Sequence, residues 1–142
     1  MLIDKAEIGA RIPHAGMMCL LDGVLSWDEQ HIVCTASGHH ADDNPLRRAG
    51  RLHIICGVEY AAQAMALHGG LAGGDQAKPR VGYFASLREV VCRVVYLDAI
   101  EGDLLVEAEL LLNEGSRAIY RFTLAGKDGE LISGRAAVVL EP

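Results

Sequence analysis

The pattern of apolar and polar positions predicts one long helix among several strands. Residues 54–68 are mostly small and apolar, and they end at Gly69-Gly70, a pair typical of a helix C-terminus. Residues 4–11 predict a short amphipathic helix before Pro13. Apolar runs with alternating or β-branched character predict strands at 17–28, 31–37, 81–97, 102–114 and 115–141.

Turn residues separate these segments. Residues 28–30 (DEQ) supply a turn between the first two strands, and Lys127-Asp128-Gly129 predicts a hairpin within the last run. Residues 38–52 read as a polar loop, and residues 71–79 as a flexible connection. The run 81–97 is long enough to require a bend or a bulge.

The predicted helix shows no obvious polar face, so we expect other elements to cover most of its sides. Its alanines allow close approach of a sheet or a second helix; they are Ala61, Ala62, Ala64 and Ala66. One helix and about five strands favour an α+β fold in which a sheet wraps around the helix. A single sheet with one helix leaves surface uncovered, which favours a dimer.

Composition narrows the class of protein. The length of 142 residues fits one domain, 1–142, and the net charge of −6 argues against nucleic acid as a partner. We see no signal peptide and no membrane span. The four cysteines form no CxxC pair, which predicts a cytoplasmic protein without disulfides. A zinc site at Cys56 and His53 fits no common ligand spacing, so neither a metal nor another cofactor is expected.

Glu59 is the single carboxylate of the predicted helix, and two interpretations are open. In an apolar setting a carboxylic acid tends to stay protonated, which suits a general acid or base, and Gln63 shares its helix face. Alternatively, Glu59 lies in the first turn, gains from the helix dipole and faces solvent.

Histidines and arginines before and along the helix are further candidates. His39 and His40 lie in the preceding loop, either as proton-transfer groups or as ordinary solvated side chains. His14 favours a structural role, and His53 and His68 bracket the helix, with His68 in its last turn, where a cation is favoured. Arg47, Arg48 and Arg51 form either a site for a phosphate or an acidic partner, or a solvated basic loop.

Three segments in order resemble the hotdog-fold 3-hydroxyacyl-acyl carrier protein dehydratases of fatty acid synthesis. IPHAGMMCLLDGV is similar to the N-terminal segment of that family, EYAAQA (59–64) to its central helix signature, and YFASLREVVCRVVYLDAIEGDLLVEAELL to its later strands. The first segment keeps the family pattern at Pro13, His14, Leu20, Leu21, Asp22 and Val24. In the second, Glu59 falls on the catalytic carboxylate and Gln63 on the glutamine.

The resemblance implies a fold, a reaction and a set of roles. The expected fold is an antiparallel hotdog sheet around one central helix, and the expected reaction removes water from a 3-hydroxyacyl thioester. Glu59 would be the acid, and His39, His40 or His53 the base, from the same or the other chain of a dimer. Substrate contacts are implied for Cys56 and Gly57, whose N–H groups would polarise the thioester carbonyl, and for Gln63 and His53. Arg47, Arg48 and Arg51 would receive acyl carrier protein or its phosphopantetheine phosphate.

The chain departs from the family pattern at the histidine that serves as the catalytic base. The family's Gly-His-Phe-Pro loop is absent, and its histidine position falls near Pro45 when counted back from Glu59. The pattern NPL followed by GVEYAAQA resembles the divergent dehydratase-like proteins of aryl-polyene pigment clusters. Three hypotheses follow: an active dehydratase with a rebuilt site, a helper subunit that pairs with a complete dehydratase, and an acyl thioesterase.

Overall fold

The apolar segment forms the central helix α2 (Gly57–Ala72) in the computed structural model of the protein, which describes residues 2–11, 18–73 and 82–140. A 3₁₀ turn, η3 (Ile54–Cys56), leads into it. The predicted helix is confirmed, with helical structure beginning at residue 54 as predicted, but its predicted end at residue 68 is wrong. The helix continues through Gly69 and Gly70 because the backbone ladder persists, with the Gly73 N–H donating to the Gly69 carbonyl at 3.0 Å.

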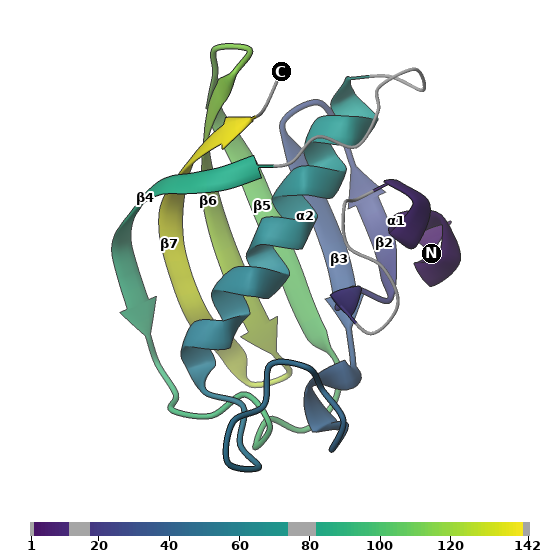
Figure 1. The fold of residues 1–142 in the computed structure, drawn as a ribbon, viewed down its shortest axis with the longest axis vertical. Coiled ribbons are helices and arrows are strands. Elements are labelled where there is room, and N and C mark those ends of the chain that lie inside the picture. Colours follow the sequence, from purple (N-terminus) through teal and green to yellow (C-terminus); the bar gives the residue numbers. More distant parts are fainter. Residues whose placement is uncertain (1, 12–17, 74–81, 141–142) are drawn as a thin grey trace.

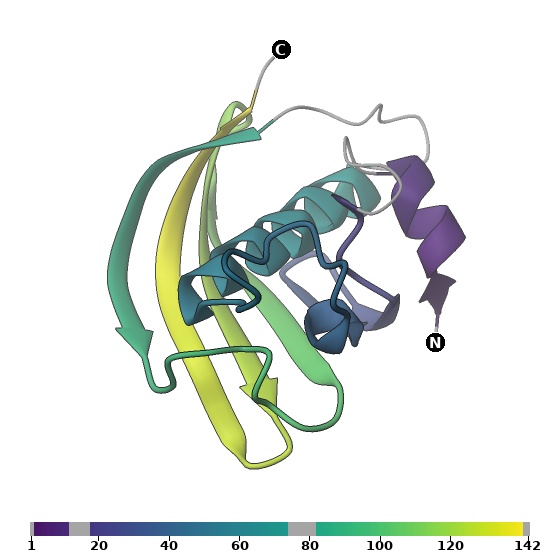
Figure 2. The same cartoon turned by 60° about the horizontal axis from the view of Figure 1, so that its bottom comes forward.

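The described strands form one antiparallel sheet in the order β1-β2-β3-β5-β6-β7-β4. This sheet curves around α2, which crosses its concave face, as Figures 1 and 2 show. The predicted α+β hotdog architecture is therefore confirmed. The strands are β1 (Ile3–Asp4), β2 (Gly23–Trp27), β3 (His31–Ala36), β4 (Gly82–Cys92), β5 (Leu104–Asn113), β6 (Arg117–Gly126) and β7 (Gly129–Leu140).

The core lies between the inner face of the sheet and α2. On β6 every second side chain is buried, as expected for a strand with one covered face. These side chains pack with those of β3, β5 and β7 against one side of the helix. The largest fully buried side chains include Tyr60, Leu67, Leu104, Phe122, Leu124 and Ile132.

Some predicted strands are shorter than their apolar runs. Within the described part of the strand predicted at 17–28, only residues 23–27 form a strand, and the backbone of residues 18–21 is bonded to side chains described below. The predicted bulge in 81–97 is confirmed, since β4 shows two register shifts against β7, but the strand ends at Cys92. The hairpin turn is also confirmed, with Gly126 paired to Gly129.

The N-terminal helix α1 (Lys5–Arg11) is confirmed close to its predicted range. Its start is capped because the Asp4 carboxylate accepts a hydrogen bond from the Glu7 N–H at 3.0 Å. Among the described residues, no helix has the length and apolar character needed to cross a membrane.

A glycine in β7 permits an aromatic ring to pack directly on the strand. A Cβ on Gly134 would lie 2.9 Å from Cζ and 3.1 Å from Cε1 of Phe122, which is fully buried on β6. It would also lie 3.1 Å from Cγ2 of Val90. The glycine therefore fits the volume of the ring, and a larger residue would force the sheet to shift.

The sheet ends at β4, whose outer edge faces no strand among the described residues. Apolar side chains are exposed on and near this edge: Leu87, Val91 and Val95. The segment after β4 is bonded to η3, since the Ile54 N–H donates to the Val95 carbonyl at 2.8 Å. Exposed Ile55 therefore lies beside exposed Val95, at the start of the central helix.

Candidate functional site

One stripe of the central helix is left partly uncovered by the described residues. Glu59 and Gly69 are exposed, and Ala62 and Ala66 are half-buried, whereas most other residues of α2 are buried. The spacing of these four positions places them on one helix face. Glu59 thus faces outward, with no hydrogen bond or ion pair to any described residue. Of the two interpretations of Glu59, the single chain shows the exposed one.

The start of the helix is already hydrogen bonded. The Cys56 N–H donates to the His53 carbonyl at 3.0 Å, and the Gly57 N–H points at the carbonyls of Ile54 and Ile55. These N–H groups, expected to polarise a thioester carbonyl, are therefore occupied in the single chain. Gly57 instead allows close packing, because an added Cβ would lie 3.2 Å from Ile132 and Leu124 side-chain atoms.

His53 caps this helix start. Its Nδ1 accepts a hydrogen bond from the Ile55 N–H at 3.1 Å. A neutral imidazole that accepts at Nδ1 carries its proton at Nε2, so no free basic nitrogen remains. This geometry gives His53 a structural contact at the start of the helix.

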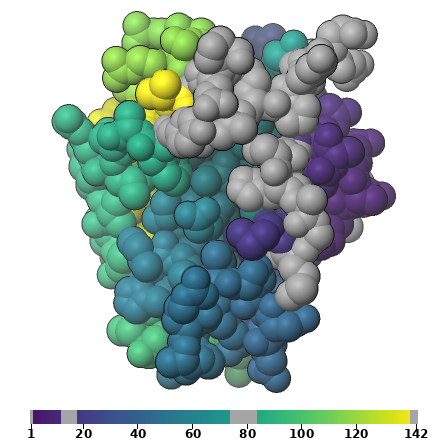
Figure 3. Space-filling view, in the orientation of Figure 1, coloured from purple at the N-terminus to yellow at the C-terminus, as the bar shows by residue number. Residues whose placement is uncertain are grey.

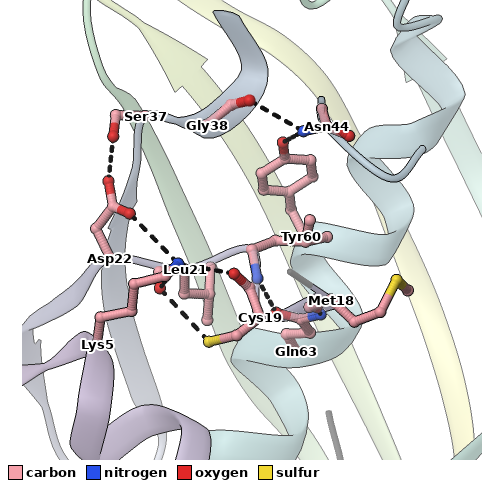
Figure 4. A network of polar contacts seen from close by, with 11 residues as sticks. Lys5, Met18, Cys19, Leu21, Asp22, Ser37, Gly38, Asn44, Tyr60 and Gln63 are labelled. Carbon is pink, nitrogen blue, oxygen red and sulfur yellow. Dashed lines mark hydrogen bonds and ion pairs between the residues drawn. The ribbon is translucent and has the colours of Figure 1, made fainter. Parts of the chain in front are cut away.

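Gln63 holds the segment that precedes β2. Its Oε1 accepts from the Leu20 N–H at 2.8 Å, and its Nε2 donates to the Met18 carbonyl at 2.5 Å. Lys5 holds the same segment from α1, donating to the Cys19 and Leu21 carbonyls (Figure 4). Gln63 is buried and its amide is engaged at both ends, so the single chain shows it positioning backbone.

Tyr60 connects the helix to the loop that precedes it. Its hydroxyl accepts a hydrogen bond from Asn44 Nδ2 at 3.1 Å, and the same nitrogen donates to the Gly38 carbonyl at 3.0 Å (Figure 4). Burial raises the pKa of Tyr60. This contact was not among the sequence-based expectations. The signal for it was a tyrosine on an apolar helix, since a buried hydroxyl requires a partner.

His39 and His40 lie on a 3₁₀ turn, η2 (Gly38–His40), and share one acceptor. The Nε2 atom of each ring faces the Ile100 carbonyl, for His39 at 2.9 Å, which assigns the proton to Nε2 in both. The ring centroids are 3.9 Å apart. His39 is fully buried and its Nδ1 has no partner among the described residues, whereas His40 is exposed. Burial lowers the pKa of His39.

The three loop arginines have different surroundings. Arg47 donates to the carbonyls of Ala41, Gly50, His39 and His40, at 2.6–3.4 Å. Arg51 is paired with Asp98 at 2.9 Å, and its guanidinium lies 3.6 Å from the Tyr96 ring centroid. Arg48 is exposed and donates only to nearby carbonyls. Arg48 is therefore the arginine of the three whose charge stays most open to a partner.

Replacing Arg47 by Met is expected to loosen the loop. The change keeps the side-chain stem but removes donors to four carbonyls, so we expect the free energy of unfolding to fall by about 1–3 kcal/mol. Amide hydrogen exchange over 38–51 should rise. Urea unfolding and exchange mass spectrometry measure both, with Arg48→Met as the matched control, expected within about 0.5 kcal/mol of the parent. Equal effects of the two changes would show that Arg47 does not hold the loop.

His68 is buried, contrary to its expected place as a cation in the last turn. Its Nδ1 lies 2.8 Å from the Tyr120 hydroxyl, and its Nε2 lies 2.9 Å from the Asp28 carbonyl. Burial lowers the pKa of His68 and raises that of Tyr120 to about 12. The correction follows from geometry: the helix extends to Ala72, so residue 68 is an interior position that faces the core.

The remaining candidates concern cysteines and metals. All four cysteines are described and none is paired with another. Burial raises the pKa of Cys34 to about 12, and it also raises the pKa of Cys56, where the Arg48 charge opposes the rise and the Glu59 charge adds to it. Within the described ranges, no group of three or more His, Cys, Asp and Glu side chains is arranged to hold a metal ion. The predicted role of His14 lies outside the described residues.

Comparisons with solved structures agree with this fold. The dehydratase heterocomplex ApeI:P from Xenorhabdus doucetiae matches with a TM-score of 0.82 at 20% identity, over 95% of this chain and 91% of that one. AziG from S. sahachiroi matches with a TM-score of 0.62 at 15% identity, covering 84% and 90%. A mutant of the thioesterase PA1618 from Pseudomonas aeruginosa gives 0.67 at 14% identity, covering 100% and 96%.

No curated protein matches the sequence of this chain. A family model does, and its description reads "ApeP-like: ApeP dehydratase", with the match extending over residues 6–142. The match includes the central helix with Glu59 and strands β2 to β7, whereas β1 lies outside it. It confirms the dehydratase family that the sequence motifs indicate. This chain belongs to the ApeP-like dehydratase family.

Proposed function

We propose that this chain takes part in the dehydration of 3-hydroxyacyl thioesters, with Glu59 as the proton donor to the leaving hydroxyl. The product is a trans-2-enoyl thioester, and the acyl chain is carried by acyl carrier protein in fatty acid or aryl-polyene synthesis. The observation that carries this proposal is the position of Glu59, the one carboxylate of α2, in an uncovered stripe of small residues. Family membership supports the reaction type.

A second hotdog chain completes the proposed site. The free edge of β4, exposed Leu87 and Val91, and the pair Ile55 and Val95 form apolar surface beside the start of α2. Covering this surface would remove Glu59 from water, and a carboxylic acid in such a setting is held in its protonated form. A homodimer and a heterodimer with a second dehydratase both satisfy this requirement. The ApeI:P heterocomplex, a structural neighbour, provides the precedent for the second.

His40 is the proposed base. Its proton lies on Nε2 against the Ile100 carbonyl, so Nδ1 carries the lone pair, and the side chain is exposed. His39 has the same arrangement but is closed off from solvent, and His53 uses its Nδ1 as a helix cap. No described contact joins His40 to Glu59 within one chain. We therefore assign the pair to two chains, one supplying the acid and its partner the base.

The reaction balances with these two groups. The base takes the proton from C2, and the electrons of that C–H bond form the C2–C3 double bond. The C3–O bond breaks as Glu59 gives its proton to the departing hydroxyl, which leaves as one water. A water-free interface favours this step because Glu59 stays protonated until it transfers its proton to the leaving hydroxyl.

Arg48 is the proposed contact for the carrier. It is exposed on a tight turn in which Arg48 and Arg51 are paired through their backbones, and Ala49 has a positive φ of 52°. The turn is held by Arg47, so the charge is presented on a fixed loop. Figure 3 shows this loop at the bottom of the face that α2 also lines. A phosphopantetheine phosphate or an acidic carrier surface is the matching partner.

Intact mass spectrometry tests the proposal. The pure chain is incubated with a 3-hydroxyacyl thioester on acyl carrier protein, alone and with a second dehydratase chain that binds it. Loss of one water by the chain alone supports a complete site between two copies. Alternatively, loss of water requires the second chain. If the mixture then removes water faster than the second chain does by itself, the result supports the helper arrangement with a shared site.

Two outcomes contradict the proposal. Release of a free 3-hydroxy acid instead of water would assign the chain to thioester hydrolysis. No change in the mass of the substrate under any pairing, with the protein folded by circular dichroism, would remove dehydration from its functions.

A further inference from the structure

A buried histidine joins three elements at the end of the molecule opposite Glu59. His68, on the penultimate turn of α2, lies between Tyr120 on β6 and the turn that links β2 to β3. The rings of His68 and Tyr120 meet edge to face, with centroids 5.6 Å apart and planes at 88°. His68 is fully buried. Both of its nitrogens are engaged, so the ring fixes the turn to the helix.

The geometry requires an unprotonated ring. The Asp28 carbonyl can only accept, so the proton of the neutral ring lies on Nε2, and Nδ1 accepts from the Tyr120 hydroxyl. A second proton on Nδ1 would face that hydroxyl. The phenol would then turn its own O–H away, and no other acceptor for it is found among the described residues. A charge and an unpaired hydroxyl would both be buried, which is costly.

The β2–β3 turn is the element that can move at least cost. Residues 25–30 are exposed, and β1 covers only Gly23 and Val24 of β2. The turn itself is closed by backbone bonds between Asp28 and His31, of 2.8 and 3.5 Å. Tyr120, by contrast, lies in the middle of a strand paired on both sides. Displacement of the turn is therefore the route by which water would reach a buried, protonated His68 at least cost.

Neighbouring charges do not cancel the effect of burial. The Asp28 carboxylate and the backbone of Asp28 and Glu29 favour a protonated His68, whereas His31 opposes it. His31 is itself paired with Glu107 at 3.2 Å. Burial is the largest influence, and the pKa of His68 lies below the ordinary value of 6.5. The contact therefore stabilises the fold at pH above 6.5, and this stabilisation is lost as the pH falls below that value.

We propose that His68 is an acid-sensitive latch that holds the β2–β3 turn on the central helix and releases it when the ring is protonated. The released turn would expose Trp27 further. This device is separate from the proposed dehydration, since it involves neither Glu59 nor the loop histidines.

The single tryptophan of the chain reports on the turn directly. Trp27 precedes Asp28 and is 37% exposed. On lowering the pH from about 7.5 to 5, we expect its fluorescence emission to shift to longer wavelength with a midpoint below 6.5, while far-ultraviolet circular dichroism stays constant. The full chain is used without substrate, so the result does not depend on any enzymatic activity.

Variants separate His68 from other titrating groups. His68→Gln keeps a donor for the Asp28 carbonyl but cannot titrate, so the transition should disappear. Tyr120→Phe removes the donor to Nδ1 and should move the midpoint to higher pH. His31→Asn should keep a pH-dependent transition in Trp27 fluorescence. This variant is the control that separates titration of His68 from titration of nearby His31.

If His68→Gln does not fold, nuclear magnetic resonance of the parent protein provides the test. In the parent protein, the His68 ring and the Trp27 indole N–H signals should titrate with one shared midpoint. Different midpoints, a Trp27 signal that does not respond between pH 7.5 and 5, or an unchanged transition in His68→Gln would each overturn the latch.

Discussion

Replacing Glu59 by Gln is expected to slow dehydration by the competent assembly by about 10²–10⁴-fold. The amide has nearly the size of the carboxylic acid but has no acidic proton for the leaving hydroxyl. Because Glu59 is exposed in the single chain and makes no hydrogen bond to the residues that the structure describes, the change should leave the fold intact. Initial rates of water loss from the carrier-bound thioester, measured by mass, give the size of the effect.

The matched control is Glu114→Gln on the β5–β6 turn. Glu114 is also exposed and its side chain makes no described ion pair, so removing its charge should not change the rate. Complex formation with the second chain is measured alongside by light scattering. A rate in Glu59→Gln equal to that of Glu114→Gln, with the complex intact, would show that another group protonates the hydroxyl.

Replacing Phe122 by Ala is expected to destabilise the fold by about 3–5 kcal/mol. The ring is fully buried on the inner face of β6, and Gly134 on β7 leaves no side chain to fill the space that the ring vacates. For a domain that is stable by about 5–15 kcal/mol, this is a large share of the total. Urea unfolding followed by circular dichroism measures it.

A double variant tests the reason for Gly134. Gly134→Ala alone should cost about 1–3 kcal/mol, because its Cβ meets the Phe122 ring at 2.9 Å. In the Phe122→Ala background the same change should cost much less, since the ring is gone, and the Val90 contact at 3.1 Å remains. Additive costs of the two changes would show that the ring is not what restricts residue 134.

The elements of the fold were predictable because local patterns define them. The alternation on β6, the Lys127-Asp128-Gly129 turn and the small apolar helix each have a signature within a few residues. The helix end at Gly69-Gly70 was mispredicted because glycine only permits a stop, and the backbone ladder continues. The segment 18–22 looked like strand because its partners, Lys5 and Gln63, are side chains distant in sequence.

Of the candidate site, the sequence indicates Glu59 but not the surroundings of this residue. Glu59 was found from its contrast with an apolar helix, but its exposure depends on which face the sheet leaves free. The occupied N–H groups of Cys56 and Gly57 follow from the 3₁₀ turn before them, which the residue types of Ile54–Cys56 do not indicate. The Tyr60–Asn44 bond and the shared Ile100 acceptor join segments through the tertiary fold, which periodicity alone does not give.

The order of the strands in the sheet determines when β4 can pair during synthesis by the ribosome. β4 leaves the ribosome before β5, β6 and β7, yet its sheet neighbour is β7, which follows the other strands among the described residues. Until Gly129–Leu140 emerges, both edges of β4 are unpaired and its apolar residues are uncovered, which invites association with other nascent chains. A ribosome stalled before β7 would therefore carry an aggregation-prone chain rather than a partly folded one.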